Sequence, residues 1–275
     1  MPELPETETI ARDLDATLRG RAIVGVTVEK GDVLREVDAA ELARRTVGAA
    51  VTRCWRRAKL VVIELDTGDR IVVQPRFTGA LLVDAGELDQ RERRYSTLHF
   101  ALDDGRRLHY RDIRRLGTVA LMNPERFAEY SGGLGVEPLE TSFTADRLSG
   151  ILRRSGQAVK KVLMDQRHVV GVGNIYANES LWRARVHPAR PARSLVADEV
   201  ARLRDGVVEV LTESIALRGT SFRDYVDASG GRGGFVERLA VYGRAGLPCR
   251  RCGAELQGTH EIDGRATVFC PACQC

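Results

Sequence analysis

The chain has 275 residues, of which 43% are hydrophobic and 29% are charged. This is the composition of a globular protein with room for two modest domains. The net charge of +4, from 42 basic and 38 acidic residues, is too small to identify a partner by itself. No run of about 18 apolar residues occurs, which excludes a membrane-spanning helix. Glu3, Glu6 and Glu8 interrupt any apolar signal segment, so we expect a cytoplasmic protein with no membrane partner.

The first 122 residues predict one helix followed by short strands. Residues 3–19 carry apolar side chains at helical spacing and end at Gly20. Alternating or β-branched runs of strand length then follow, separated by turn signals such as Asp103-Asp104-Gly105. They cover 22–30, 49–54, 60–65, 70–74, 80–83, 98–102, 107–110 and 118–122. This spacing predicts an antiparallel sandwich or barrel, and we expect residues 1–122 to form a β-sandwich domain with an N-terminal helix.

The pattern changes after residue 122. Helical periodicity dominates the next part of the chain, at 145–154, 159–166, 174–184 and 198–217. A Gly-rich stretch, 228–234, then precedes a cysteine-rich tail. We therefore expect an α+β multidomain protein, in which a linker at 123–138 leads to a helical domain at 139–236 and a small zinc module at 237–275.

Four cysteines in this tail have metal-ligand spacing. They are Cys249, Cys252, Cys270 and Cys273, two C-x2-C pairs separated by seventeen residues. Four thiolates at this spacing suit one tetrahedral zinc ion. Two disulfides are the alternative, which a reducing cytosol disfavours. Four protein ligands fill the coordination sphere, so we expect a structural zinc ion, and no organic cofactor.

Lysine is rare in this chain. The positions are Lys30, Lys59, Lys160 and Lys161, and the remaining 38 basic residues are arginines. Lysine is a compact, flexible point charge that suits a phosphate or a reacting group, and arginine does not replace it freely. Each lysine is therefore a candidate functional residue, although chance explains so small a number equally well.

The N-terminus offers a nucleophile. A small residue after Met1 favours removal of the methionine, which exposes the secondary amine of Pro2. A free α-amino group has a pKa near ~8, so part of it is neutral at pH 7. A neutral amine can attack a sugar C1′ and form an iminium ion, and the neighbouring Glu3 could move protons. On composition alone, a frayed acidic terminus is the simpler interpretation.

The whole string from Met1 to Glu6 is similar to the signature start of formamidopyrimidine-DNA glycosylases, and the resemblance continues through the chain. Residues 56–59 resemble the family's hairpin lysine segment, and residues 111–117 resemble its intercalation loop. Residues 163–177 resemble its helix–two-turn–helix, and residues 241–244 lead into the zinc finger as they do in the family. These motifs occur in the family's order over nearly all 275 residues. Leu4 and the match at 169–177 favour this branch over endonuclease VIII.

The resemblance implies a monomeric base-excision-repair enzyme that acts on double-stranded DNA containing a damaged base. Such an enzyme is a DNA glycosylase and AP lyase that excises oxidised purines, 8-oxoguanine and formamidopyrimidines, and then cuts the strand by β- and δ-elimination. The implied catalytic residues are Pro2 as the Schiff-base nucleophile, Glu3 as the acid/base, Lys59 and Arg265. Glu6 is the implied structural carboxylate that holds the start of the helix.

The resemblance also implies a DNA-binding set and a set that fills the gap left by the extruded base. The implied DNA-binding residues are Gln74, Arg114, Lys160, Asn174 and Tyr242. The implied gap-filling residues are Phe77, Arg114 and Leu116. The segment from 220 to 234 resembles a loop that closes over the lesion. Where the family has Met, Arg and Phe in the gap, this chain has Phe, Arg and Leu, and glutamine replaces a phosphate-binding histidine. These departures put the base preference in doubt.

Two alternatives remain open at the level of sequence. One is an endonuclease VIII-like glycosylase for oxidised pyrimidines or abasic sites. The other is a non-catalytic zinc-ribbon protein that binds DNA. Pro2 followed by Glu3 argues against the second alternative, because a protein that only binds DNA has no need of a free proline terminus.

Overall fold

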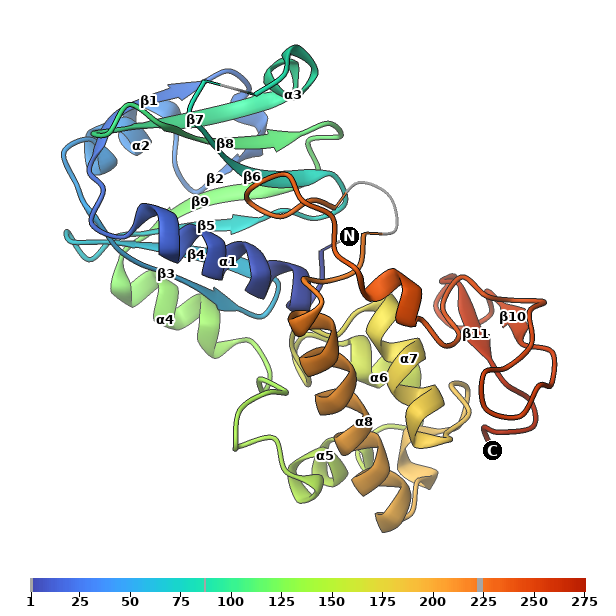
Figure 1. Ribbon diagram of the computed structural model, residues 1–275. Coiled ribbons are helices and arrows are strands. Elements are labelled where there is room, and N and C mark those ends of the chain that lie inside the picture. The colour runs from blue at the N-terminus through green and yellow to red at the C-terminus, as the bar shows by residue number, and fades with distance from the viewer. Residues whose placement is uncertain (1, 87, 222–224) are drawn as a thin grey trace. The chain divides into compact units, whose positions relative to one another are not determined.

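The computed structural model describes residues 2–86, 88–221 and 225–275 (Figure 1). The chain forms two compact units. Unit 1 contains residues 1–132 and 217–234, and unit 2 contains residues 133–216 and 235–275. In the described residues, no helix has the length and apolar character required to span a membrane.

Unit 1 is built on two β-sheets. The four-stranded sheet has the order β1 (Ile23–Val28), β7 (Ser96–Leu102), β8 (Arg107–Asp112) and β6 (Gly79–Asp84). The five-stranded sheet has the order β2 (Leu34–Arg35), β9 (Thr118–Met122), β5 (Arg70–Gln74), β4 (Leu60–Leu65) and β3 (Val51–Arg57). All neighbours are antiparallel except the short pair β2–β9, which is parallel. The predicted sandwich is therefore confirmed, with one parallel edge strand.

The two sheets and the N-terminal helix share one hydrophobic core. Helix α1 (Leu4–Leu18) lies along the five-stranded sheet beside β3 and β4 (Figure 1). Its residues Ile10, Leu14 and Leu18 are fully buried, in the same cluster as Phe100 of one sheet and Ile63 of the other. Burial of this helical stripe fixes α1, and with it the N-terminus, on the sandwich.

Three helices of unit 1 were not predicted from the sequence. They are α2 (Ala39–Thr46), α3 (Gln90–Arg94) and α4 (Pro124–Gly132), and a 3-10 turn, η1 (Gly31–Val33), precedes β2. Helix α4 lies in the segment expected to be a linker, and it packs on the sandwich through Phe127, whose ring centroid is 5.5 Å from that of Trp55. The segment 217–234, expected with the helical domain, belongs to unit 1.

Unit 2 contains the predicted helices and the cysteine module. The helices are α5 (Ala145–Leu152), α6 (Val159–Met164), α7 (Asn174–Ala184) and α8 (Ala197–Ala216), with 3-10 turns η2 (Ala192–Ser194) and η3 (Phe235–Arg238). A hairpin of β10 (Gln257–Thr259) and β11 (Thr267–Phe269) follows. Tyr176 of α7 and Ser214 of α8 share a buried hydrogen bond of 2.6 Å.

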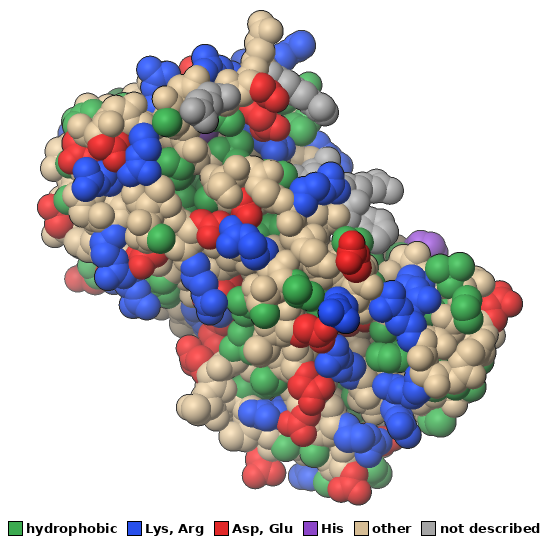
Figure 2. Space-filling view, viewed as in Figure 1, with side chains coloured by type: hydrophobic (Ala, Val, Ile, Leu, Met, Phe, Trp, Pro, Cys, Tyr) green, Lys and Arg blue, Asp and Glu red, His purple; other side chains and the backbone are tan. Residues whose placement is uncertain are grey.

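On the face of the molecule drawn in Figure 2, Lys and Arg side chains are interspersed with Asp and Glu side chains over each unit. This arrangement agrees with the small net charge of +4. Any attraction for a polyanion must therefore come from local groups.

Candidate functional site

The N-terminal segment is buried and ordered by a carboxylate. Pro2 and Glu3 are buried at the start of α1, and Glu3 is only 2% exposed. The backbone N–H of Glu3 donates to Oε2 of Glu6 at 2.8 Å, the arrangement of a helix capping box. The interpretation of a frayed acidic terminus is therefore wrong for residues 2–6.

The second oxygen of Glu6 binds a distant part of unit 1. Its Oε1 accepts a 2.7 Å hydrogen bond from the backbone N–H of Thr220. Gly219 has φ +84°, and a Cβ at this position would lie 2.9 Å from Glu6 Oε1, so glycine fits there without displacing the carboxylate. One carboxylate thus ties the start of α1 to the base of the segment 217–234.

Ion pairs anchor the same segment further along the helix. Arg218 donates at 2.6 Å to Asp13 of α1 and at 2.6 Å to Asp227, which is 3% exposed. The backbone N–H of Val83 donates to the carbonyl of Ala228 at 3.2 Å. The predicted lesion-covering loop, 220–234, is therefore anchored at Thr220, Asp227 and Ala228. Its residues 222–224 lie outside the described residues.

Lys59 sits on the β3–β4 hairpin. Ala58, directly before it, has φ 54°, which closes the turn. Arg56 pairs with Glu8 of α1 at 2.9 Å and also donates to the Ala58 carbonyl at 3.1 Å. The hairpin tip is thereby held beside the N-terminal half of α1, which also carries Pro2.

A buried carboxylate organises the two loops that were expected to fill the gap in the DNA. Asp112, 1% exposed at the end of β8, accepts from the Thr78 hydroxyl of one loop. It also accepts from the backbone N–H groups of Arg114 at 3.2 Å and Gly117 at 2.8 Å in the other loop. Burial, together with this carboxylate, raises the pKa of Tyr110, whose hydroxyl donates to Asp112 at 3.3 Å.

The side chains of these loops project from the protein. Phe77, Leu116 and Ile113 are 46%, 40% and 37% exposed, high values for large apolar residues. The Arg114 guanidinium carbon lies 5.3 Å from the centroid of the Phe77 ring. The structure therefore brings Phe77 and Arg114 together. It also exposes Ile113, a residue of the predicted intercalation loop to which the sequence analysis gave no role.

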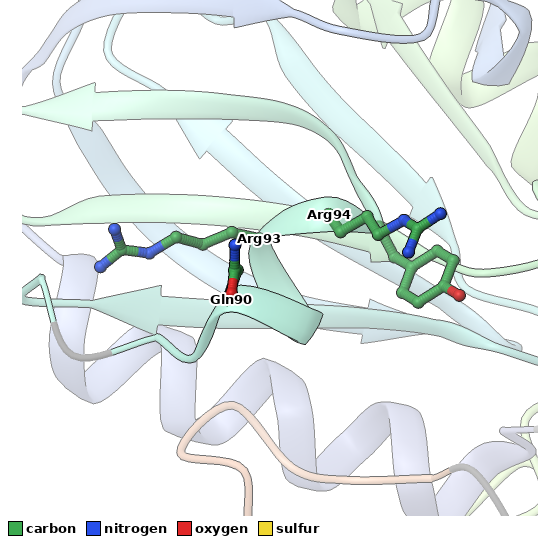
Figure 3. A pocket seen from close by; sticks show the side chains of 4 residues that line it. Gln90, Arg93 and Arg94 are labelled. Carbon is green, nitrogen blue, oxygen red and sulfur yellow. The ribbon is translucent and has the colours of Figure 1, made fainter.

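Gln74 and helix α3 lie near these loops. The Gln74 amide oxygen accepts from Arg76, which has φ 50°, at 3.3 Å. The N–H of Asp112 donates to the carbonyl of Tyr95 at 3.0 Å, so the end of α3 adjoins the Arg114 loop. Figure 3 shows an open pocket on α3, where Arg93 and Arg94 extend to opposite sides.

In unit 2, the predicted DNA-binding residues differ in exposure. Asn174 and Tyr242 are half-buried, and Arg265 is exposed. Lys160 is fully buried, and its Nζ donates to the Ala266 carbonyl at 3.0 Å and to the Thr267 hydroxyl at 2.7 Å. The expectation that Lys160 contacts phosphate directly is at odds with this position, because the ammonium points into the protein.

Glu179 is a further residue that the sequence analysis missed. It is 3% exposed on α7 and accepts backbone N–H bonds from Ala240, Val241 and Tyr242 at 2.8–3.0 Å. Burial raises its pKa, while these donors oppose that shift. The carboxylate fixes the backbone of Tyr242, seven residues before the first cysteine of the cluster, Cys249.

The four cysteines form a metal centre. The Sγ atoms of Cys249, Cys252, Cys270 and Cys273 all lie within 4.8 Å of one another. Sulfur ligands about 2.3 Å from a tetrahedral zinc ion are about 3.8 Å apart, so the cluster fits zinc. The Trp182 indole donates to the Cys249 sulfur at 3.4 Å, as expected for a thiolate acceptor. The predicted structural zinc site is confirmed.

The chain matches two family models. Residues 1–119 match the N-terminal domain of formamidopyrimidine-DNA glycosylase, and residues 134–226 match its H2TH domain. The formamidopyrimidine-DNA glycosylase of Pelotomaculum thermopropionicum is 39% identical over 276 residues, which cover 100% of this chain and 99% of the relative. That of Xanthomonas campestris pv. campestris is 42% identical over 274 residues and is covered completely, as is this chain.

Solved structures agree with this assignment. Lactococcus lactis Fpg in complex with DNA containing an abasic site superposes with a TM-score of 0.91 at 30% identity, covering 99% of both chains. The MutM (Fpg) protein from Thermus thermophilus superposes with a TM-score of 0.87 at 35% identity, covering 99% of this chain and 98% of the other. The chain therefore belongs to the formamidopyrimidine-DNA glycosylase family.

Proposed function

We propose that this chain is a bifunctional DNA glycosylase and AP lyase that removes oxidised purines from double-stranded DNA in base excision repair. The observation that carries the proposal is the N-terminus. Pro2 is buried at the start of α1, and the Glu6 carboxylate holds the backbone next to it. A protein that only binds DNA gains nothing from this arrangement.

The reaction uses the secondary amine of Pro2. Its nitrogen attacks C1′ of the damaged nucleotide, the bond to the base breaks, and an iminium ion forms. Glu3 moves the protons, first at the sugar ring oxygen. The iminium acidifies the adjacent sugar proton, so β-elimination and then δ-elimination cut the strand on the two sides of the lesion. Lys59, held beside the same half of α1, contacts the phosphate on the lesion side.

The remaining residues hold the bent DNA with the damaged base extruded. Extrusion of a base costs a few kcal/mol, which contacts to phosphate and an apolar wedge offset. We assign phosphate contacts to Gln74, Asn174, Tyr242 and Arg265 and the wedge to Phe77, Arg114 and Leu116. Gln74 can donate a hydrogen bond but carries no charge, so its phosphate contact is weaker than that of a protonated histidine.

The predicted domains divide this work. The sandwich of residues 1–122 supplies the nucleophile and the wedge, the helices within 139–216 bind phosphate, and the zinc finger at 237–275 carries Arg265. The lesion-covering segment, 217–234, belongs to the same unit as the sandwich. We propose that the protein acts as a monomer on the nucleoid DNA of a bacterial cytoplasm.

Retention of Met1 tests this function, because it converts the Pro2 nitrogen into an amide that cannot attack C1′. Protein purified with Met1 in place should give no borohydride-trapped complex with an abasic-site duplex. Treatment of the same sample with methionine aminopeptidase should restore trapping and the excision of 8-oxoguanine. Trapping by protein that demonstrably keeps Met1 would refute the assignment. Preferential excision of oxidised pyrimidines after the treatment would support the endonuclease VIII-like alternative instead.

A further inference from the structure

Lys160 is a buried cation whose ammonium group binds the zinc-finger hairpin. It lies on α6, is 0% exposed, and ranks among the largest fully buried side chains of the described residues. Its Nζ donates to the Ala266 carbonyl and to the Thr267 hydroxyl, which belong to the turn and first residue of β11. A buried ammonium is tolerated only when polar partners replace its water, so these contacts are part of the folded structure.

The same carbonyl receives two more donors from α7. The side-chain amide of Asn174 donates to the Ala266 carbonyl oxygen at 3.0 Å, and that of Asn178 approaches it at 3.4 Å. The Asn178 side-chain oxygen accepts the backbone N–H of Val268 at 2.9 Å. Side chains from two helices thus converge on one peptide of the hairpin.

This peptide directly follows Arg265. The hairpin has only three paired residues on each strand, and a two-stranded sheet of this size is marginal in isolation. The Arg265 side chain is 48% exposed, and its nearest described anion is Asp263 at 3.5 Å. The direction in which Arg265 extends therefore depends on how firmly the backbone of Ala266 is held.

We propose that Lys160 is a positioning residue, which holds the Ala266 carbonyl so that Arg265 is presented to the DNA backbone. Lys160 itself makes no phosphate contact in this arrangement. The proposal rests on the proposed function of Arg265 in DNA binding. In this proposal Lys160 acts on DNA binding through Arg265 and not through a phosphate contact of its own. Asn174, which donates to the same carbonyl, also helps to hold the Ala266 peptide.

Hydrogen exchange in the free protein tests the structural half of the proposal. Lys160→Met removes the ammonium and keeps an apolar stem, and Lys161→Met removes the neighbouring charge, which is 47% exposed and pairs with Asp263 of the same turn at 3.8 Å. We expect the amides of residues 265–268 to exchange about tenfold faster in Lys160→Met than in wild type, with one zinc ion retained. Lys161→Met removes only an exposed ion pair, which contributes little to stability, and should raise their exchange by a clearly smaller factor. Unchanged exchange in Lys160→Met would overturn the proposal.

A double-mutant cycle on DNA tests the functional half. Arg265→Ala, Lys160→Met and the double variant are compared in single-turnover excision of 8-oxoguanine. If Lys160 acts through Arg265, Lys160→Met lowers the rate in the wild-type background but by less than twofold in the Arg265→Ala background. Equal losses in both backgrounds would mean that Lys160 acts on the DNA independently, and would overturn the proposal. If Arg265→Ala has no effect while hydrogen exchange responds to Lys160→Met, the assigned role of Arg265 fails and the contact between Lys160 and the hairpin stands.

Thr267→Val serves as a second variant if Lys160→Met fails to fold. It keeps the side-chain volume and the buried charge and removes the hydroxyl, which accepts from Nζ at 2.7 Å and donates to the Arg265 carbonyl at 3.1 Å. Exchange at residues 265–268 should rise in the same direction by a smaller factor. No rise in Thr267→Val, with folding and zinc content intact, would count against the proposal.

Discussion

Arg114 in unit 1 and Arg265 in unit 2 are both exposed, and their turns are held by buried groups of opposite charge. Arg114 lies in the loop between β8 and β9, which belong to different sheets, and Arg265 lies in the turn of the β10–β11 hairpin. The Arg114 turn is organised by the Asp112 carboxylate, which is 1% exposed. The Arg265 turn is organised by the Lys160 ammonium, which is 0% exposed. The sign of the buried charge follows from the kind of polar group that each turn presents to it, donors in one turn and acceptors in the other.

In the wedge loops, the unpaired groups are donors. The N–H groups of Arg114 and Gly117 and the Thr78 hydroxyl point at one place, and a carboxylate has enough lone pairs for all of them. In the finger, the Ala266 carbonyl and the Thr267 hydroxyl accept, so an ammonium with three donors suits them. A buried full charge forms stronger hydrogen bonds than a neutral group, which explains its use in both turns.

Loss of zinc should have the largest effect on DNA binding, because it should unfold the hairpin that carries Arg265 and leave the Arg114 loop intact. Structural zinc typically contributes roughly 10–16 kcal/mol to the folding of small modules. Chelation, or Cys252→Ala, should unfold the finger hairpin and abolish specific DNA binding, while amides around Asp112 keep their protection. Cys54→Ala is the control, since burial raises the pKa of that thiol to about 12 and it lies outside the metal centre. Undiminished DNA affinity in zinc-free protein would contradict the prediction.

Asp112→Asn should have the next largest effect. The amide places an N–H₂ group where one carboxylate oxygen accepts from Gly117 N–H and the Tyr110 hydroxyl. A buried donor left without an acceptor costs about 1–3 kcal/mol, so we expect a loss of about 3 kcal/mol in the free energy of unfolding and slower excision of every lesion. Denaturant titration measures the first and single-turnover kinetics the second. Asp104→Asn, on an exposed turn, should change the free energy of unfolding and the excision rate by much less. Equal effects of the two variants would contradict the role assigned to Asp112.

Arg114→Ala should alter selectivity more than stability. A guanidinium offers a rigid set of donors, and a cytosine opposite the lesion offers O2 and N3 as acceptors, whereas adenine presents a donor. A good bidentate contact discriminates by about 1–3 kcal/mol, so the preference among opposite bases should fall roughly ten- to hundredfold. Excision of 8-oxoguanine opposite each of the four bases measures it. Leu116→Ala should instead lower all four rates about equally, and an unchanged ranking in Arg114→Ala would show that another residue reads the base.

Phe77→Leu should have the smallest effect. It keeps an apolar wedge and removes the ring on which the Arg114 guanidinium rests at 5.3 Å. An exposed cation–π contact is worth about 0.5–1 kcal/mol, so opposite-base discrimination should fall about two- to fivefold. The matched control is Ile113→Leu, which changes a neighbouring exposed apolar residue without touching a ring. If Phe77→Leu retains full discrimination, the position of Arg114 is set by its backbone alone, as we infer for Arg265.

The features that could be predicted from the sequence are those encoded locally. The zinc ligands follow from two short spacings, and α1, β4, β5 and α7 follow from periodicity, with bounds close to those observed. The roles proposed for Pro2 and Arg265 rest on resemblance to a family and stay predictions. Helix α2 was missed, although Asp38 caps it by accepting from the Glu41 N–H at 2.8 Å, because eight residues give little periodicity.

The buried charges could not be predicted, because their partners are remote. Lys160 lies 106 residues from Ala266, and neither neighbour of Lys160 in the sequence indicates that its ammonium is internal. Glu179 lies 61 to 63 residues from its three donors. A charged residue in a helix is usually solvated, so sequence reasoning assigns such residues to the surface unless the tertiary fold is known.

The hydrogen bond between Glu6 and Thr220 has a consequence for biosynthesis. The two residues are 214 positions apart, so a ribosome that adds about 5–20 residues per second makes them roughly 10 to 40 seconds apart. The segment that bears Pro2 is the first to emerge, and its hydrogen bonds are among the last to be completed. A nascent or truncated chain that ends before residue 217 contains the whole sandwich but lacks the partner for one oxygen of Glu6. Such a fragment should give no borohydride-trapped complex with an abasic-site duplex.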